Sequence, residues 1–369
     1  MRIQTYLTIT LLSVMLAACS SDNDIDNASG NDEEYAITLA AGIGGLTTSS
    51  RAAETYNDTV PSSTSPLAAD VWLSSDRGVY IHKADDYVTS THAGNDEYHL
   101  HHQMTYTSGQ LTFLNASSVK NLLLYSVDKT KRTYIVGFYP QNVFSLVGSE
   151  GDSDYGKTAE ASVDGRTDLM FAPEVYGSRV TTEKIARQDF KHILTWLKVC
   201  ARAENEEAVN SWGRIIGLKL KNAKTNVTVD LSTTDINTLR PTFTGDTDMN
   251  FDRKDNGNSG TISEENYYPL TTYITEMADI LCAPVEINNP SEDNAGTAEY
   301  TLEVTTTGGV VKEVPVQLSR DYDGNNIDNG HYTASELYVI SLVFGLSPTI
   351  SASCSLQEWD NEARDLLMK

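Results

Sequence analysis

Three histidines lie close together in the stretch EYHLHHQ, and histidine is a common ligand of metal ions in proteins. They are His99, His101 and His102. On a β-strand, His99 and His101 would point to the same face and could hold one metal ion between them. Two histidines do not complete the four-ligand shell typical of a zinc site. We therefore predict histidines on a strand surface and no metal site.

Two acidic loops rich in Asn and Gly carry oxygen ligands of the kind that calcium prefers. The first, 321–330 (DYDGNNIDNG), lacks the glycine at loop position 6 and the glutamate at position 12 that an EF-hand needs. Asn326 and Tyr332 stand there instead. The second loop, 252–260, has Lys254 at a ligand position. Asp and Asn suit hairpin turns because their side chains bond the local backbone, so we predict solvated turns and no bound calcium.

Motifs that carry enzymatic chemistry are missing from the sequence. It contains no GxSxG, no HExxH, no P-loop and no GxGxxG. We therefore predict that the chain is not an enzyme and needs no cofactor. A β-sandwich hydrolase is the weakest alternative.

The four cysteines divide into one near the N-terminus, Cys19, and three that are widely spaced: Cys200, Cys282 and Cys354. Their odd number and their spacing do not indicate a disulfide framework or a zinc site. We expect the three to be small buried apolar residues, and one non-essential disulfide is the alternative.

The N-terminus has the layout of a secretory signal peptide. Arg2 is followed by an apolar run from Tyr6 to Leu16 and then by small residues, and the run is shorter than the roughly 20 residues that span a membrane. The segment LAAC, ending at Cys19, resembles the bacterial lipobox, whose cysteine carries acyl chains such as palmitate. An acidic tract at 22–26 resembles surface-export signals of Gram-negative lipoproteins. We predict a signal peptide over 1–18 and attachment to the outer membrane through Cys19; the alternative is an ordinary signal peptide with an incidental cysteine.

An isolated arginine follows the first strand-forming segment. Arg51 is the only Lys or Arg between Arg2 and Arg77, and it lies in a loop rich in Ser and Thr. Before it, apolar residues alternate as in a half-buried strand; they are Ile37, Leu39, Ala41 and Ile43. An arginine in a loop can be an unremarkable surface residue, so this pattern alone leaves its role open.

The rest of the chain is a series of short segments rich in Val, Ile, Thr and Tyr, separated by turn residues. One segment, 204–212, indicates a helix of a turn or two. Many short strands without crossover helices predict an all-β fold of two tandem antiparallel β-sandwiches (Greek-key, transthyretin-like). We expect a tether and a first strand over 19–51, and sandwiches over 52–186 and 187–369. The expected strands are 71–75, 78–83, 97–107, 110–114, 121–127, 132–140, 168–173, 190–203, 214–222, 226–232, 266–274, 279–287, 298–307, 309–319, 335–345 and 349–359.

Charge excludes several kinds of partner. The 369 residues include 51 acids and 27 bases, a net charge of −24. This argues against nucleic acid and anionic lipid head groups as ligands. The apolar content of 40% is enough to build cores for two domains.

Several short motifs, in their order along the chain, resemble fimbrillins, the type V pilin precursors of Gram-negative gut and oral anaerobes. The lipobox, the tether, a strand and Ser-Arg-Ala at residue 51 open the series. The sequence departs from the fimbrillin pattern in two ways. It has no Trp ahead of the Tyr-Pro strand, and its tail after Trp359 is short. The further matching stretches are VGFYPQ (136–141), TDLMFA (167–172), FKHILTWLKVCA (190–201) and the closing strands up to Trp359.

The resemblance implies assembly by donor-strand exchange. An arginine-specific surface protease would cut between Arg51 and Ala52, and the strand before the cut would leave. A strand from the next pilus subunit would then fill the groove, a form of β-augmentation. Its candidate plug residues alternate in the last strand and are Ile350, Ala352, Cys354 and Leu356. The alternative is that this strand stays in its own domain.

Two functions from different classes remain open. The first is a structural subunit of a surface fimbrium, as stalk, adapter or tip, that becomes extracellular after processing and serves adhesion. The second is a glycan-binding lipoprotein that stays anchored, which predicts an uncut Arg51 and a surface platform of aromatic residues. A host or glycan ligand fits either one.

Overall fold

The computed structural model describes the chain in segments. Cys19, Leu39, Arg51, Ala52, His99 and both acidic loops (252–260 and 321–329) lie outside them. The described residues are 37, 40–43, 67–75, 79–84, 86–91, 100–107, 110–113, 125, 132–140, 143–148, 157–178, 180, 182, 184–185, 187–235, 238–251, 267–287, 298–318, 330–346 and 349–357.

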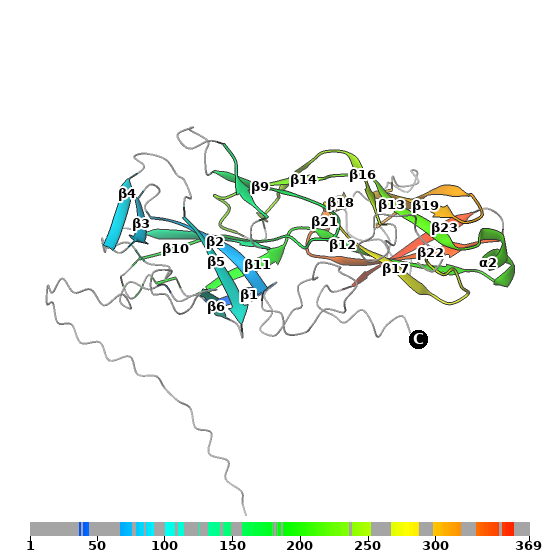
Figure 1. Ribbon diagram of the computed structural model, residues 1–369, viewed down its shortest axis with the longest axis horizontal. Helices are drawn as coiled ribbons and strands as arrows, with labels where there is room; N and C mark the ends of the chain where they lie inside the picture. The colour runs from blue at the N-terminus through cyan, green and yellow to red at the C-terminus, as the bar shows by residue number, and fades with distance from the viewer. Residues whose placement is uncertain are drawn as a thin grey trace, which may run out of the picture. The chain divides into compact units, whose positions relative to one another are not determined.

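The first sheet closes on itself. Its nine strands have the order β4-β3-β2-β5-β6-β1-β11-β10-β7, and β2 also pairs with β7. Seven of these strands, all except β3 and β4, therefore form a closed circuit that we call the seven-stranded ring. Figure 1 shows β1 close to its partners β6 and β11. The nine strands are β1 (Ala40–Ile43), β2 (Leu67–Ser75), β3 (Val79–Ala84), β4 (Asp86–Thr91), β5 (Leu100–Thr107), β6 (Gln110–Phe113), β7 (Thr133–Tyr139), β10 (Met170–Gly177) and β11 (Arg187–His192).

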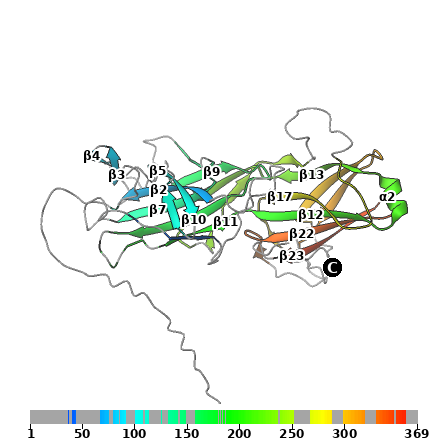
Figure 2. The ribbon, with the colours of Figure 1, turned by 60° about the horizontal axis from the view of Figure 1, so that its bottom comes forward.

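Two four-stranded sheets follow, with the orders β17-β12-β22-β23 and β16-β13-β19-β20. Figure 2 shows β12, β22 and β23 side by side, as their pairing requires. Apolar residues from both sheets belong to one hydrophobic core, which also includes residues of β7 and β10. These strands are β12 (Thr195–Ala203), β13 (Ile215–Ala223), β16 (Thr247–Asn250), β17 (Thr275–Cys282), β19 (Tyr300–Thr306), β20 (Val311–Val316), β22 (Leu337–Phe344) and β23 (Ile350–Gln357).

Two small sheets complete the described fold. One has the order β15-β14-β9-β8, and the other pairs β18 with β21. The β9–β14 pairing joins residues on both sides of the expected domain boundary at 186/187. The strands are β8 (Ser145–Leu146), β9 (Thr158–Ser162), β14 (Asn226–Asp230), β15 (Thr242–Thr244), β18 (Glu286–Ile287) and β21 (His331–Tyr332).

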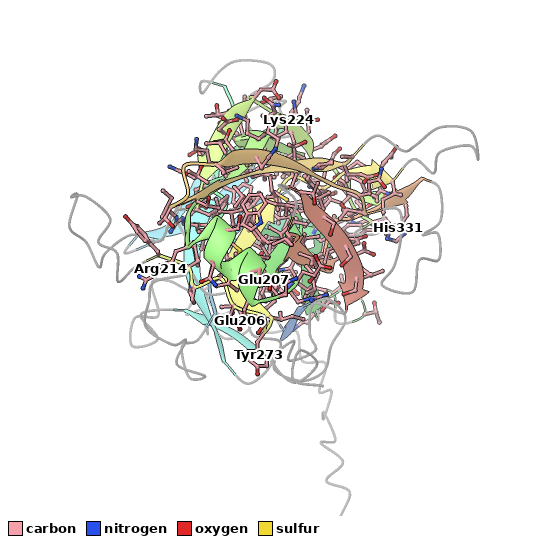
Figure 3. All side chains as sticks on the ribbon, turned by 90° about the vertical axis from the view of Figure 1, so that its right-hand side faces the viewer. Glu206, Glu207, Arg214, Lys224, Tyr273 and His331 are labelled. Atoms are coloured by element: carbon pink, nitrogen blue, oxygen red, sulfur yellow. The ribbon has the colours of Figure 1, made fainter. Side chains whose placement is uncertain are left out.

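The predicted short helix is confirmed as α2 (Glu206–Trp212). Asn205 caps it, because its side chain accepts a hydrogen bond from the backbone N–H of Ala208 at 2.9 Å. Glu206 and Glu207 in the first turn complement the helix dipole and are exposed (Figure 3). No helix among the described residues is long and apolar enough to cross a membrane.

The all-β class is confirmed, and most strand pairs are antiparallel as predicted. Two pairs are parallel, β1 with β11 and β12 with β22; sequence patterns carry no information on such long-range pairing. The single strand expected over 190–203 is wrong, because β11 ends at His192 and β12 begins at Thr195 in another sheet. The strand expected at 266–274 is also wrong over its described part. Only Tyr268 forms a bridge there, to Ile215, and the proline that follows it has no N–H to donate.

Candidate strand-exchange site

β1 lies between β6 and β11 in the seven-stranded ring. It pairs in parallel with β11 over four residue pairs, from Ala40 with Arg187 to Ile43 with Phe190. On its other side, Ala40 pairs antiparallel with Gln110 of β6 among the described residues. Both neighbours keep their remaining partners, since β6 pairs with β5 and β11 pairs with β10. Without β1 the ring is therefore an open sheet with two free edges, and we call the space between them the acceptor gap.

The strand β11, which borders the acceptor gap, carries a large buried aromatic residue. Phe190 of β11 is 1% exposed, and it pairs with Ile43 of β1. Its ring reaches across β10 to β7, because a Cβ built on Gly137 would lie 2.7 Å from Phe190 Cζ and 3.2 Å from Ala172 Cβ. Gly137 and Ala172 are paired neighbours in β7 and β10. Two small residues on adjacent strands thus make the slot that holds this ring.

Three of the four residues predicted as plugs of the removable strand lie within the described structure. Ile37 is buried, with 6% of its surface exposed. Ala41 and Ile43 lie in β1 and pair with Gln188 and Phe190. Leu39 lies outside the described residues. Within the segment predicted to leave, the structure describes a strand over Ala40–Ile43.

The processing residues are not part of the described structure. Cys19, Arg51 and Ala52 all lie outside it, so lipidation and cleavage remain predictions. In the sequence, Arg51 follows the end of β1 by eight residues.

The candidate donor strand lies in its own sheet. β23 pairs antiparallel with β22 over all eight of its residues, from Ile350 with Phe344 to Gln357 with Leu337. It forms the edge of that sheet. Cys354 is buried, Ile350 and Ala352 pack half-buried against the core, and Leu356 is 40% exposed. Burial therefore alternates from Ile350 to Cys354 and ends before Leu356. In this structure the strand pairs within its own sheet.

The three remaining cysteines are free and buried, as expected. Burial raises the pKa of the thiols of Cys200, Cys282 and Cys354 to about 12. A thiol that stays protonated at neutral pH does not act as a nucleophile or a metal ligand. The described residues also contain no group of three or more His, Cys, Asp or Glu that could hold a metal.

Sequence reasoning missed a buried acid–histidine pair. His192 Nδ1 lies 2.8 Å from Asp168 Oδ2, and both side chains are almost fully buried. Ser335 Oγ donates to the backbone carbonyl of His192. Asp168 and His192 belong to the stretches TDLMFA and FKHIL, which β10–β11 pairing brings together through Met170 and His192. The pair lies where the chain passes from the seven-stranded ring to β12. Buried polar side chains are ordinarily hydrogen-bonded, so we assign this pair a structural role.

Comparisons place the chain near fimbrial and adhesion proteins. No family model and no curated protein matches the sequence. A candidate cell adhesion protein from Bacteroides uniformis ATCC 8492 is 16% identical, with a TM-score of 0.48 over 88% of this chain and 98% of that one. A fimbrial protein from Bacteroides vulgatus ATCC 8482 is 12% identical, with a TM-score of 0.42 over 87% and 99%. The tip fimbrial protein Mfa3 from Porphyromonas gingivalis, truncated at its C-terminus, is 11% identical, with a TM-score of 0.34 over 88% and 98%.

The names of all three refer to fimbriae or cell adhesion. Because their TM-scores are below 0.5, the functional proposal rests on this chain's own strand pairings.

Proposed function

We propose that the chain is a structural subunit of a surface fimbrium, exported as a lipoprotein and assembled by donor-strand exchange. In this proposal acyl chains on Cys19 hold the precursor on the outer membrane. An arginine-specific protease cuts between Arg51 and Ala52, β1 leaves, and a strand from another subunit enters the acceptor gap. The two tandem sandwiches, with the first completed by the incoming strand, belong to the same proposal.

The position of β1 is the observation that supports this proposal most. The strand is four residues long, and three of the four are Ala or Gly (AAGI). It nevertheless closes the ring between two strands that are otherwise complete. Losing it leaves unpaired N–H and C=O groups on β6 and β11, and a free edge of this kind favours pairing with another strand.

The energy of release is modest. Ile37 is buried, and full burial of an Ile side chain contributes about 1.5–3 kcal/mol. The Ala and Gly residues of β1 have less apolar surface to contribute. Cleavage at Arg51 would end the covalent link between β1 and the rest of the ring. A strand attached only by these contacts can be displaced by another strand with an alternating apolar face.

The donor in this proposal comes from the C-terminal region of another subunit. Ile350, Ala352, Cys354 and Leu356 supply an alternating apolar face. In the described chain this strand pairs with β22, so donation requires the β22–β23 ladder to open.

Mass spectrometry of the protein from its native cell surface tests the proposal. A mature form that begins at Ala52 is expected, and Arg51→Lys should abolish it, because lysine keeps the charge but is not cut by an arginine-specific protease. Arg77→Ala serves as the control and should process normally. A form that keeps lipidated Cys19 together with Ile37 would contradict the proposal and favour a permanently anchored glycan-binding lipoprotein.

A further inference from the structure

One end of the sheet β17-β12-β22-β23 exposes three large apolar side chains. β12 ends at Ala203, which pairs with Phe344 at the end of β22, and the neighbouring β17 begins at this same end. Tyr273 and Ile274 precede β17 and are 81% and 42% exposed, and Leu346 follows β22 and is 55% exposed. Because neighbouring strands are about 4.8 Å apart, these side chains flank the end of β12 on both sides. Exposed apolar side chains that gather in one place point to an interaction surface, whereas isolated ones are ordinary.

Tyr273 lies on a loop that is tied to β12. Its backbone N–H donates to Thr271 Oγ1 at 3.2 Å, and Thr271 Oγ1 donates to its carbonyl at 2.9 Å. The Thr271 carbonyl in turn accepts a hydrogen bond from the N–H of Ala203 at 2.7 Å. A loop that is ordered before binding loses less conformational entropy when a partner binds.

Three acidic side chains border the apolar ones. Glu204 follows β12 directly, and its Oε2 would lie 3.6 Å from a Cβ built on Gly345, which directly follows β22. Glu206 and Glu207 lie in the first turn of α2 and are exposed. Figure 3 shows both of them in the same region of the view as Tyr273. We call these six residues the distal surface: Tyr273, Ile274, Leu346, Glu204, Glu206 and Glu207.

A donated β23 would leave its own subunit at the distal surface. Donation opens the β22–β23 ladder, while β22 keeps its place beside β12. Leu346 lies two residues after the end of β22 and four residues before Ile350, the first candidate plug. Four residues of extended chain span at most about 14 Å. Leu346 of the donor must therefore lie within that distance of the acceptor gap that its strand fills.

We propose that the distal surface docks on a second copy of this chain, against the β6 and β11 strands that border the acceptor gap receiving β23. This inference rests on the proposed function and holds for either direction of the incoming strand. β11 carries a basic residue near each of its ends, Arg187 and Lys191, with Asp189 between them. Either end of the gap thus offers a cation to the carboxylates of the distal surface. Docking adds these contacts to the strand ladder, so a whole subunit binds the gap more tightly than its isolated strand does.

Two chains that can react in only one direction test the inference. The acceptor is the full chain with the recognition sequence of a site-specific protease in place of Arg51, cleaved and depleted of β1. Its own β23 is locked by Ser341→Cys and Ser353→Cys, which face each other in the β22–β23 ladder. Paired residues of antiparallel strands have Cα atoms about 4.5–5.5 Å apart, which suits a disulfide. The donor is the full chain with Arg51→Lys, which keeps β1 and so cannot accept a strand.

The distal surface is altered in the donor alone. Its variants are Tyr273→Ser and Leu346→Ser, singly and together. Tyr176→Ser is the matched control, because Tyr176 is also exposed, at 51%, but belongs to β10 of the seven-stranded ring. Light scattering after size-exclusion chromatography, over a concentration series, measures heterodimer formation. A synthetic peptide of 349–357, with Cys354 replaced by serine, measures binding of the strand without the rest of the donor.

The inference predicts that the double variant binds the acceptor at least about tenfold more weakly than the unaltered donor, and that Tyr176→Ser binds as the unaltered donor does. Equal binding by all donors, with the peptide also bound, would overturn the inference and leave strand exchange standing. If neither the peptide nor the unaltered donor binds although β1 is gone by mass, both the inference and the proposed function fail.

Discussion

Replacing Gly137 with alanine tests whether the ring is assembled as described. Gly137 lies in β7, and the ring of Phe190 comes from β11, with β10 between them. An alanine Cβ at this position would lie 2.7 Å from Phe190 Cζ, 3.0 Å from Cε1 and 3.2 Å from Ala172 Cβ. Ordinary carbon contacts are about 3.5–4.0 Å, so the aromatic ring would have to move by about 1 Å.

The expected cost follows from two opposing effects. Overpacking a buried site costs about 1–3 kcal/mol. Replacing glycine in a strand recovers about 0.5–1 kcal/mol, because the unfolded chain loses conformational freedom. We therefore expect Gly137→Ala to lower the free energy of unfolding by about 0.5–2 kcal/mol.

A double-mutant cycle with Phe190→Leu isolates the contact. Leucine has no atom at the position of Phe190 Cζ. It therefore removes the clash with the new Cβ at residue 137 but leaves the slot partly empty. The two changes together should cost less than their sum, by about 1 kcal/mol or more. Urea unfolding followed by circular dichroism measures all four proteins.

Additive effects would refute the reasoning. They would mean that residues 137 and 190 are not in contact, and that β11 does not lie across β10 from β7. Ala172→Gly gives a matched check, because widening the same slot should partly rescue Gly137→Ala.

Three further predictions concern the rest of the chain. Since burial raises the pKa of the three free thiols to about 12, iodoacetamide at pH 8 should leave them unmodified in the folded protein and modify them in urea; rapid labelling of the native protein would contradict their burial. Trp212→Phe should lower the free energy of unfolding by about 1 kcal/mol, because the indole N–H donates to the Gly345 carbonyl at 2.8 Å; an unchanged urea midpoint would argue against this bond. A hydrogen bond from Lys219 lowers the pKa of Glu303 below the ordinary 4.5, so its stabilising effect is present above that pH and lost as the pH falls through the lowered value. Glu303→Gln should therefore lose less stability than the wild type on acidification below pH 4.5, and equal acid sensitivity would exclude this pair as a cause.

Sequence patterns predicted the local elements well. Alternation located β14, where Val227 and Val229 are buried between exposed Asn226 and Asp230. Alternation also located β23. Composition and bounding turn residues located β22, whose first four residues are all buried, and the segment 204–212 gave α2. These features depend on residues within about ten positions of one another, which is the range over which hydrophobic periodicity carries information.

Long-range pairing could not be predicted in the same way. The closure of the ring by β2 with β7, and the parallel place of β1 beside β11, depend on which strands meet in three dimensions. The short strands β8 and β15, of two and three residues, are too brief to show a period. The slot for Phe190 combines residues more than fifty positions apart. In the sequence, the slot is visible only as a glycine in β7 and an alanine in β10, each next to larger residues.

Hydrogen–deuterium exchange before and after cleavage tests the central claim most directly, namely that β1 closes the ring and that its loss opens an edge for another strand. The full chain with a site-specific protease sequence in place of Arg51 is compared uncut, cut, and cut with the 349–357 peptide. We predict faster exchange in β6 and β11 after β1 leaves, renewed protection on adding the peptide, and no change in β22. Unchanged protection of β11 after β1 is lost would contradict the account.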